Sequence, residues 1–362
     1  MANLPNQDGM FAFFFRRLLA IPQFAAPTSP TTVLLIGANS GIGLAAAEIL
    51  LSLPGLKNLL LTTRSREKSL QTRQHLANLC PASVNIETFE VDLTDYDSIR
   101  EFVTNLNAGS NSGTRSVNIA ILNAGLMMGK YELGHGRFEL TLQVNYISTA
   151  LLSLLLLPNL RSGSGTSSSP SRLSICSSDG HYFATPIPTL YNSDDGILCY
   201  LNDPSNFSSQ GAYLTSKLLG ILFGRALSEK LDPTEVLVNM INPGIARTNL
   251  FRDLGWLFRI SMWLCGRSVH VAAGVVVQGA LGDSGVVSGG FYSEGRDTKP
   301  LSEVFTERGR ELQERLWSET LDLLRAEYEG STSALAQIYN DGLGGRGRMV
   351  EASGTVRAKD DL

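Results

Sequence analysis

The sequence has few cysteines and little excess of either charge. Its 362 residues include four cysteines, and 30 basic against 34 acidic side chains give a formal net charge of -4. The cysteines are far apart in the chain, without a CxxC pair or a histidine spacing typical of zinc, so neither a disulfide framework nor a metal site is expected. The charge does not favour a nucleic-acid partner, and we expect a small-molecule partner in a reducing, cytoplasmic compartment. The four cysteines are Cys80, Cys176, Cys199 and Cys265.

The N-terminal part also lacks an apolar run long enough to cross a membrane. The apolar stretch of residues 10–24 is split by Arg16 and Arg17 and ended by Pro22, and a spanning helix needs about 20 apolar residues. No basic segment precedes it and no small-residue cleavage pattern follows it, unlike a signal peptide. Two interpretations of residues 1–29 stay open: an amphipathic helix packed on the domain, or a helix in peripheral contact with a membrane surface.

Short runs rich in Val, Ile and Leu alternate with helical patterns along the chain, which is typical of strands buried on both faces of a parallel sheet. The alternation predicts one α/β domain over residues 30–329, a doubly wound Rossmann-type fold with a seven-stranded parallel sheet flanked by helices. The predicted strands are Thr32 to Ile36, Asn58 to Arg64, Val84 to Asp92, Val117 to Asn123, Arg172 to Ser177, Val236 to Ile241 and Gly289 to Tyr292. The predicted helices are Ile42 to Ser52, Arg66 to Leu79, Asp95 to Leu106, Arg137 to Leu157, Ala212 to Glu229, Val269 to Ala280 and Ser302 to Ala326.

Three segments depart from this alternation. Residues 161–171 are rich in Ser and Gly, which predicts a flexible surface loop. Residues 186–210 form an insertion of a length usual for functional loops or disorder. After Glu329 the composition turns to Gly, Ser and charge, so residues 330–362 are expected to be a disordered tail.

A glycine-rich turn follows the first predicted strand and opens a helix. The spacing is GxxxGxG, and glycines at such a turn let the backbone approach a pyrophosphate held by helix N–H groups. Glycines also serve tight turns for steric reasons alone, so the position after the first buried strand is what favours nucleotide binding. The residues expected to contact a dinucleotide here are Gly37, Asn39, Ser40, Gly41, Ile42 and Gly43.

The second predicted strand ends at Arg64, about 20 residues beyond the turn, where an NAD enzyme would carry an acidic residue for the ribose 2′-hydroxyl. A guanidinium there instead suits a 2′-phosphate, so NADP(H) is the expected cofactor. The alternative is a solvated arginine that pairs with Glu67.

Further candidates close the third and fourth predicted strands, at the sheet edge where ligands of this fold bind. Asp92 and Leu93 could contact the adenine, and Asn123, Ala124 and Gly125 the adenosine side of the cofactor. A strand cap and a turn would explain the same residues equally well.

Tyr213 and Lys217 form the only YxxxK in the sequence. Positions four apart share one face of a helix, so the phenol and the ammonium can point at one site. A nearby cation favours the phenolate and is expected to lower the pKa of Tyr213, which would suit proton exchange with a substrate oxygen. An amphipathic helix with an exposed lysine would give the same spacing, but Ser177 and Ser178 end the preceding strand, and Asn145 lies in the helix before it.

Together these motifs resemble the short-chain dehydrogenase/reductase superfamily over residues 32–324. Three segments are similar to its retinol-dehydrogenase-like branch, which fungal reductases of secondary metabolism share. The segments are Asn123 to Met128, Arg172 to His181 and Asn242 to Gly244.

The resemblance implies a role for each matching residue. It implies that Tyr213 is the general acid/base and that Lys217 binds the nicotinamide ribose. Ser178, the second serine of its pair, would bind the substrate oxygen, and Asn145 would hold a water relay to the lysine. Pro243, Gly244 and Thr248 match the loop that holds the nicotinamide carboxamide.

The sequence departs from the family pattern in three places. Ile36 replaces the usual Thr before the glycine turn and removes a hydroxyl that would brace it, while Leu122 replaces the first Asn of an Asn-Asn-Ala-Gly motif. The gap between Ser178 and Tyr213 is long for the family, which leaves the role of the insertion open.

Substrate-covering segments are expected near 186–210 and 247–268. Within the second, residues 251–265 carry Trp256, Phe258 and Trp263 on an apolar face, with Arg252 and Arg259 seven residues apart. A lid over a hydrophobic substrate, a membrane-surface helix and plain core packing are the three interpretations.

The sequence thus predicts an NADP(H)-dependent oxidoreductase acting on CH–OH groups, a carbonyl reductase or alcohol dehydrogenase for a hydrophobic small molecule, in secondary metabolism. Alternatives are a non-catalytic NADP(H) sensor and a retinoid, steroid or lipid alcohol dehydrogenase. An epimerase of the extended branch would have a glycine turn spaced GxxGxxG, whereas the turn after the first predicted strand here is spaced GxxxGxG. The resemblance also implies a homo-oligomer.

Overall fold

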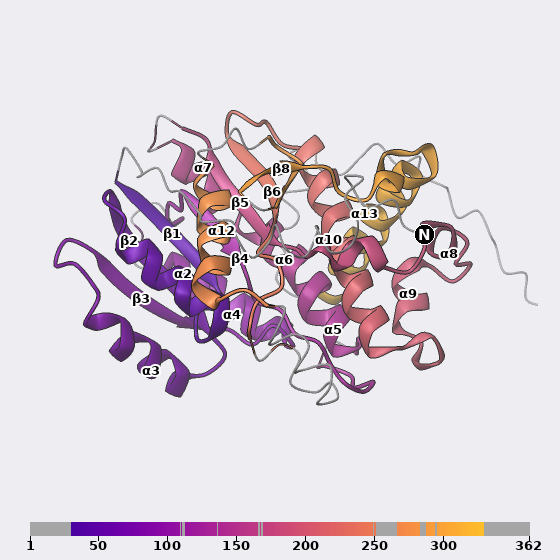
Figure 1. The fold of residues 1–362 in the computed structure, drawn as a ribbon, viewed down its shortest axis with the longest axis horizontal. Helices are drawn as coiled ribbons and strands as arrows, with labels where there is room; N and C mark the ends of the chain where they lie inside the picture. Colours follow the sequence, from indigo (N-terminus) through magenta and orange to yellow (C-terminus); the bar gives the residue numbers. More distant parts are fainter. Residues whose placement is uncertain are drawn as a thin grey trace, which may run out of the picture.

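The computed structural model describes residues 30–328 apart from 109, 111–112, 136, 166, 168, 249, 251–265, 283–286 and 294. The predictions for residues 1–29, for the tail 330–362 and for the lid segment 251–265 lie outside these residues. The described part is one α/β domain built on a single twisted sheet with helices on both faces (Figure 1). The predicted doubly wound fold is confirmed.

The sheet has eight strands in the order β3-β2-β1-β4-β5-β6-β7-β8. Strands β1 to β7 pair in parallel, and the order reverses between β1 and β4, which is the switch point where ligands of such sheets bind. The strands are β1 (Thr31–Ile36), β2 (Leu56–Thr63), β3 (Asn85–Glu90), β4 (Ile119–Leu122), β5 (Ser171–Cys176), β6 (Val236–Asn242), β7 (Gly290–Ser293) and β8 (Arg296–Thr298).

The seven predicted parallel strands are present, and the sheet has one strand more than predicted. The additional strand, β8, turns back on β7 as an antiparallel hairpin, with Phe291 opposite Thr298. Its three residues carry no apolar side chain, so the hydrophobic pattern that located the other strands could not reveal it.

Helices cover both faces of the sheet. On one face, α2 and α12 pack together against the central strands, and α3 lies over β2 and β3. These three are α2 (Gly41–Leu51), α3 (Arg66–Ala77) and α12 (Val269–Leu281). The other face carries α4 (Tyr96–Asn107), α5 (Leu140–Leu142), a π-helix η1 (Gln143–Ile147), α6 (Ser148–Leu155), α7 (Leu157–Ser164) and α10 (Ser209–Glu229).

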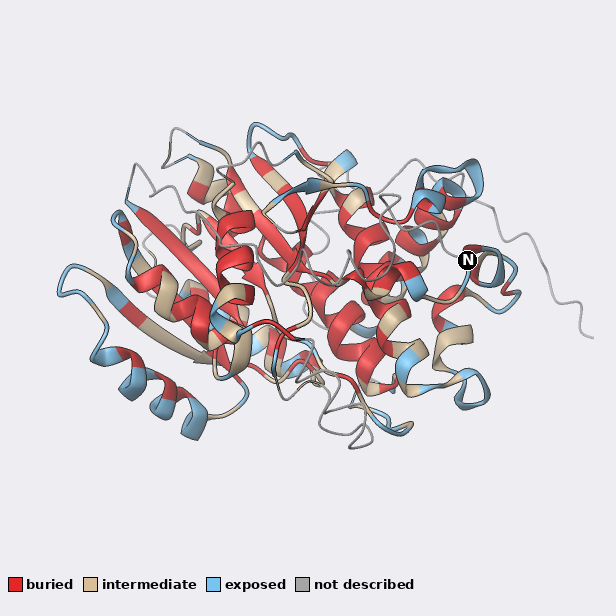
Figure 2. Ribbon diagram, in the orientation of Figure 1, coloured by how far each residue is buried: buried red, intermediate tan, exposed pale blue. Residues whose placement is uncertain are grey.

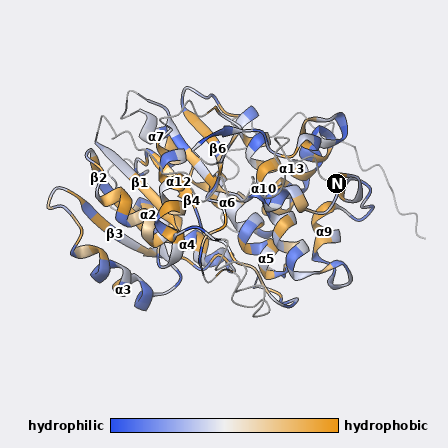
Figure 3. Ribbon diagram, in the orientation of Figure 1, coloured by the Kyte–Doolittle hydropathy of each residue, from blue (hydrophilic) through white to orange (hydrophobic). Residues whose placement is uncertain are grey.

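The sheet therefore separates two hydrophobic cores, one under each helical layer. Successive residues of β1 enter opposite cores: Leu34 and Ile36 enter one, and Val33 and Leu35 the other. Burial is continuous along the central strands, while α3 is exposed over most of its outer surface (Figure 2). Hydropathy follows the same division, with apolar residues along the strands and the inward helical faces (Figure 3).

The predicted helix from Arg137 to Leu157 is broken in the structure. Arg137 has a φ of 61° and lies before the helix, which begins at Leu140 after the capping carboxylate of Glu139. At Leu156 the helix ends and α7 begins with Pro158 in its first turn, since a proline fits there but not in a helix interior.

The flexible loop predicted for residues 161–171 was partly wrong, because α7 continues to Ser164. Gly163 lies against the start of β4: a Cβ there would come within 2.0 Å of the Val117 carbonyl oxygen. Asn118 also donates a hydrogen bond to the Gly163 carbonyl at 3.0 Å. The glycine that suggested flexibility instead permits close packing.

The short helix η2 (Asp179–Phe183) precedes the long insertion, which has its own helices, α8 (Ile187–Tyr191), α9 (Ile197–Asn202) and η3 (Pro204–Asn206). After β8, the 3₁₀ helix η5 (Ser302–Phe305) leads to the long helix α13 (Glu307–Tyr328). Helix α13 packs on α10, α8 and α9, and these elements gather at one end of the domain (Figure 1).

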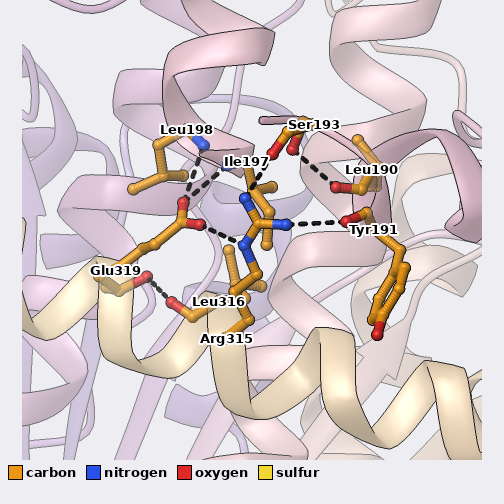
Figure 4. A network of polar contacts seen from close by, with 9 residues as sticks. Leu190, Tyr191, Ser193, Ile197, Leu198, Arg315, Leu316 and Glu319 are labelled. Carbon is orange, nitrogen blue, oxygen red and sulfur yellow. Dashed lines mark hydrogen bonds and ion pairs between the residues drawn. The ribbon is translucent and has the colours of Figure 1, made fainter. Parts of the chain in front are cut away.

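Two side chains of α13 form hydrogen bonds with backbone groups of the insertion (Figure 4). Arg315 donates to the carbonyl oxygens of Tyr191 at 2.8 Å and Ser193 at 2.5 Å, at the C-terminal end of α8. Glu319 accepts from the Ile197 N–H at 2.7 Å, at the N-terminal end of α9. Each charge has the sign that stabilises the helix end it contacts. Arg315 and Glu319 also bond to each other at 2.9 Å.

In the described part, no single helix is long and apolar enough to span a membrane. Leu140–Leu155 and Leu157–Ser164 meet the length and composition criteria only as a pair, bent by 46° at their junction.

Candidate active site

The glycine turn lies between β1 and α2, at the switch point of the sheet. Gly37 has a φ of 84°, a conformation that favours glycine. A Cβ on Gly43 would lie 2.0 Å from the Gly37 carbonyl oxygen, so the close approach of helix to turn requires a glycine at 43 as well. Ser40 gives α2 no side-chain cap, which leaves the first helical N–H groups to face an anion. The turn therefore fits the pyrophosphate of a dinucleotide.

Ile36 lacks the hydroxyl that would brace the glycine turn, and Thr62 on the neighbouring strand β2 supplies one instead. Thr62 accepts a hydrogen bond from the Gly37 N–H at 3.0 Å, and its carbonyl oxygen accepts from the Ala38 N–H at the same distance. Ile36 meanwhile is buried in the core. No motif in the sequence pointed to Thr62, because its contact depends on the pairing of β1 with β2.

The residues after β4 join the turn to the catalytic candidates. The Asn123 amide donates to the Gly37 carbonyl at 3.1 Å. Gly125 lies against two of the predicted catalytic residues, since a Cβ there would be 3.3 Å from Asn145 Oδ1 and 3.5 Å from Lys217 Nζ. A side chain at 125 would therefore push both groups away.

Asn145 lies in the middle of the π-helix, a helical irregularity often found at functional sites. Its side chain bonds both the N–H and the carbonyl of Leu126, each at 2.8 Å, and also donates to the Ser216 hydroxyl at 3.0 Å. Ser216 in turn bonds the Tyr213 carbonyl at 2.7 Å. Asn145 is thereby fixed between the loop after β4 and the helix that carries Tyr213.

Tyr213 and Ser178 lie together, as predicted. Burial raises the pKa of Tyr213 to about 12, and a hydrogen bond with the Ser178 side chain offsets this only in part. The expected lowering of the phenol pKa by Lys217 is thus contradicted, because desolvation outweighs every favourable contact of the phenolate. The phenol is therefore in its protonated form at neutral pH.

Lys217 is buried, and its Nζ donates to the carbonyl oxygen of Cys176 at 3.1 Å. Burial lowers the pKa of Lys217. Cys176 closes β5, and burial raises the pKa of its thiol to about 12, so this cysteine is not a thiolate nucleophile.

The loop after β6 forms the opposite side of the site. Gly244 has a φ of 76°, and a Cβ on it would lie 2.9 Å from the Arg267 guanidinium carbon. Thr248 reaches the glycine turn: a Cβ on Gly41 would be 3.5 Å from its methyl carbon. The loop that the resemblance assigned to the nicotinamide therefore lies next to the turn assigned to the pyrophosphate.

These elements enclose a cleft of about 640 Å³ at the carboxyl edge of the sheet. Most of the predicted cofactor residues line it together with Tyr213 and Lys217. The predicted residues in its lining are Gly37, Asn39, Ser40, Gly41, Ile42, Asn123, Ala124, Gly125, Tyr213, Lys217, Pro243 and Thr248. Four other predicted residues are not in the lining but lie next to residues that are. They are Gly43, Asn145, Ser178 and Gly244.

Sequence reasoning missed several lining residues, among them Ser177, Arg247 and the apolar Met127, Met128 and Leu250. The two methionines follow the Asn-Ala-Gly segment after Leu126, and that proximity was the signal that could have identified them. They add apolar side chains to the lining of the cleft.

Besides Gly43 and Gly244, three predicted cofactor residues lie outside the lining. Arg64 follows β2 and is exposed. Asp92 Oδ1 accepts from the Thr94 N–H at 2.9 Å and hydroxyl at 2.8 Å, which is the strand-cap interpretation of that residue. The Leu93 carbonyl accepts from the Ser148 hydroxyl at 2.5 Å.

Comparisons with known proteins agree with this geometry. The family model for short chain dehydrogenases matches residues 31–183. A short chain dehydrogenase of the fungus Arthrobotrys oligospora is 30% identical over 85% of this chain and 96% of its own. The short-chain dehydrogenase/reductase phmF of Phaeosphaeria nodorum is 30% identical over 82% of this chain and 87% of its own. Both relatives thus match nearly the whole described domain.

Solved structures share the fold at lower identity. The NADPH-bound carbonyl reductase from chicken fatty liver superposes with a TM-score of 0.56 at 22% identity, over 75% of this chain and 99% of its own. The carbonyl reductase Sniffer of Drosophila melanogaster gives a TM-score of 0.54 at 22% identity, over 75% of this chain and 98% of its own.

Proposed function

The chain belongs to the short-chain dehydrogenase/reductase family of oxidoreductases, and we propose that it interconverts a carbonyl and an alcohol on a hydrophobic small molecule with NADP(H). The observation that carries the proposal is the position of Tyr213 and Lys217 in the cleft that the glycine turn also lines, with Ser178 hydrogen-bonded to Tyr213. A sensor or scaffold that did not turn over would have no need of all three.

Each protein group has a distinct task in this proposal. A reduced nicotinamide bound in the cleft supplies the hydride to the carbonyl carbon. Ser178 donates a hydrogen bond to the substrate oxygen, and Tyr213 gives that oxygen its proton, leaving an alcohol. Lys217 holds the ribose, and Asn145 fixes the loop after β4, where Gly125 lies against the lysine. With its raised pKa, Tyr213 is protonated at neutral pH, which is the form that reduction uses.

NADP(H) is favoured over NAD(H) by Arg64. Its exposed guanidinium follows β2, where the second strand of this fold meets the adenosine ribose, and no acidic side chain stands at that position. A planar guanidinium suits the 2′-phosphate that distinguishes the two cofactors. The chicken carbonyl reductase of the same fold binds NADPH, which agrees with this assignment.

The lining of the cleft includes the apolar residues Met127, Met128 and Leu250. We therefore infer a bulky, lipophilic ketone or aldehyde. Its place in fungal secondary metabolism is supported by the fungal sources of the relatives. Within the family we assign the chain to the retinol-dehydrogenase-like branch, on the segments Asn123 to Met128 and Arg172 to His181.

Self-association, which the family resemblance favours, is proposed to avoid the outer face of α10. Helix α13 of the same chain already covers that face, with Trp317 stacked on Phe223 at 5.4 Å between ring centres. A partner copy would have to use another surface.

NADPH oxidation by the purified protein against a panel of lipophilic ketones and aldehydes tests the proposal, beside NADH and a Tyr213→Phe variant. Turnover that prefers NADPH and is lost with Tyr213→Phe is the expected result. Nucleotide binding without turnover across the panel would favour a sensor, and absence of binding to either nucleotide would overturn the assignment.

A further inference from the structure

One buried amide connects the serine loop to the cofactor side of the cleft. Asn242, the last residue of β6, is 2% exposed. Its Oδ1 accepts from the Gly244 N–H at 3.0 Å and from the Asp179 N–H at 3.3 Å. Its Nδ2 donates to the Ser293 hydroxyl at 2.9 Å and to the Asp179 carboxylate. These four contacts use both lone pairs and both protons of the amide.

Asp179 is the residue that follows Ser178, and it contacts Asn242 twice, through its N–H and through its carboxylate. A charged acceptor makes the second of these bonds stronger than a neutral one would be. The side chain is 9% exposed, so water competes little for it. The peptide that carries Ser178 is therefore held against the end of β6.

A second contact fixes the same loop from the other side. His181 is fully buried, and its Nδ1 lies 2.6 Å from the Ser178 carbonyl oxygen. Its Nε2 accepts from the Leu301 N–H at 3.1 Å, so the ring proton is on Nδ1 and is donated to Ser178. The backbone of Ser178 is therefore held from both sides, and its hydroxyl accepts from the Gly180 N–H of the same loop at 3.0 Å.

On the cofactor side, the same Asn242 oxygen fixes the Gly244 turn. The turn leads to Thr248, which packs beside Gly41 of the pyrophosphate turn. Asn242 thus fixes the separation between the serine that binds the substrate oxygen and the loop that faces the nicotinamide.

We propose that Asp179 and Asn242 form a positioning pair that sets the geometry of Ser178 relative to the bound nicotinamide. The inference rests on the proposed function, because it assigns Ser178 to the substrate oxygen. Neither residue touches the reacting atoms. Hydride and proton must reach adjacent atoms of one carbonyl, and a displacement of about 1 Å can lower such a rate about a hundredfold. The pair therefore acts on the chemical step rather than on nucleotide binding.

Asp179→Asn tests the pair with little change in shape, because it places an amide proton or a neutral oxygen against Asn242. We expect kcat to fall about tenfold or more, while the dissociation constant of NADPH changes less than about twofold. Asp232→Asn is the matched control: Asp232 caps a turn through Thr234 at the surface, and asparagine caps as well.

A double-mutant cycle separates positioning from general damage. In a Ser178→Ala background, Asp179→Asn should cause no further loss of kcat, because the group it positions is gone. An undiminished loss in that background, or an unchanged kcat in the wild-type background, would overturn the proposal. The exchanged pair Asp179→Asn with Asn242→Asp restores a donor opposite an acceptor and should recover part of the rate.

Hydrogen exchange supplies a readout that needs no substrate. Peptides covering residues 177–183 should exchange faster in Asp179→Asn than in wild type or Asp232→Asn, with peptides of β1 and β4 unchanged. Equal exchange of the serine loop in all three proteins would refute the pair even if no carbonyl were turned over. Absence of wild-type turnover would instead count against the proposed function alone.

Discussion

The Nζ of Lys217 lies 5.6 Å from the centre of the Tyr213 ring, yet its hydrogen bond goes to the carbonyl oxygen of Cys176. With the phenol buried, its pKa is raised to about 12. The acid form of Tyr213 is present below that pKa and is lost only as the pH rises through it.

This predicts opposite pH profiles for the two directions of reaction. Reduction needs the phenol, so its kcat/KM should be flat from about pH 6 to about pH 9. Oxidation needs the phenolate, so its kcat/KM should rise about tenfold per pH unit over the same interval. Initial rates in both directions on one ketone–alcohol pair check this. A fall of the reduction rate near neutral pH would show that the bound cofactor lowers the phenol pKa.

Gly43→Ala should abolish nucleotide binding. The new methyl group would lie 2.0 Å from the Gly37 carbonyl oxygen and 2.7 Å from the Asn123 amide nitrogen, so the pyrophosphate turn would have to move. Overpacking of this kind costs about 1 to 3 kcal/mol. The quench of protein fluorescence by NADPH measures binding. Gly220→Ala in α10 is the control, because its Cβ would meet nothing within 4 Å and alanine favours a helix.

Arg64→Gln should weaken NADPH binding about tenfold to a hundredfold, the range expected for one charge-assisted contact to phosphate. NADH affinity should stay the same, since NADH lacks the 2′-phosphate. Isothermal titration of both nucleotides measures the effect, with Arg73→Gln on the exposed surface of α3 as the control. Equal losses for the two nucleotides would remove Arg64 from the 2′-phosphate site.

Trp317→Ala should destabilise the folded chain by about 3 to 5 kcal/mol, as measured by urea unfolding. The indole is 3% exposed and stacks on Phe223, so its removal leaves a cavity between α13 and α10. Trp317→Phe should cost far less, because within the described part of the chain the indole nitrogen has no hydrogen-bond partner to lose. Similar costs for the two variants would mean that the indole nitrogen contributes more than the stacked ring.

The sequence was sufficient for the sheet and for the cleft because both depend on short-range patterns. The apolar run of β1 leads directly into the glycine turn, and the spacing of Tyr213 and Lys217 lies within one helix. Residues that share a strand end or a helical face are brought to one edge by the parallel topology alone.

The parts that could not be predicted depend on contacts between distant segments. Thr62 replaces a hydroxyl missing at position 36 only because β2 pairs with β1. The pKa of Tyr213 depends on how deeply α10 is buried, which the YxxxK spacing does not reveal. The lid role expected for residues 186–210 stays a prediction. Helices α8 and α9 of this segment pack on α13, and none of their residues is in the lining of the cleft.

The hydrogen bonds from α13 to the ends of α8 and α9 have a consequence for folding during synthesis. Arg315 is 124 residues beyond its partner Tyr191, and Glu319 is 122 residues beyond Ile197. A nascent chain emerging from the ribosome has already made the glycine turn, Ser178 and Tyr213 before either cap exists. Until α13 arrives, the apolar sides of α8 and α9 lack their cover, and such surface is prone to aggregate. Helix α13, the last helix in the described part of the chain, therefore completes a structure begun more than a third of the chain earlier. A message truncated before α13 would yield a protein whose active-site residues are all present but whose fold is unfinished.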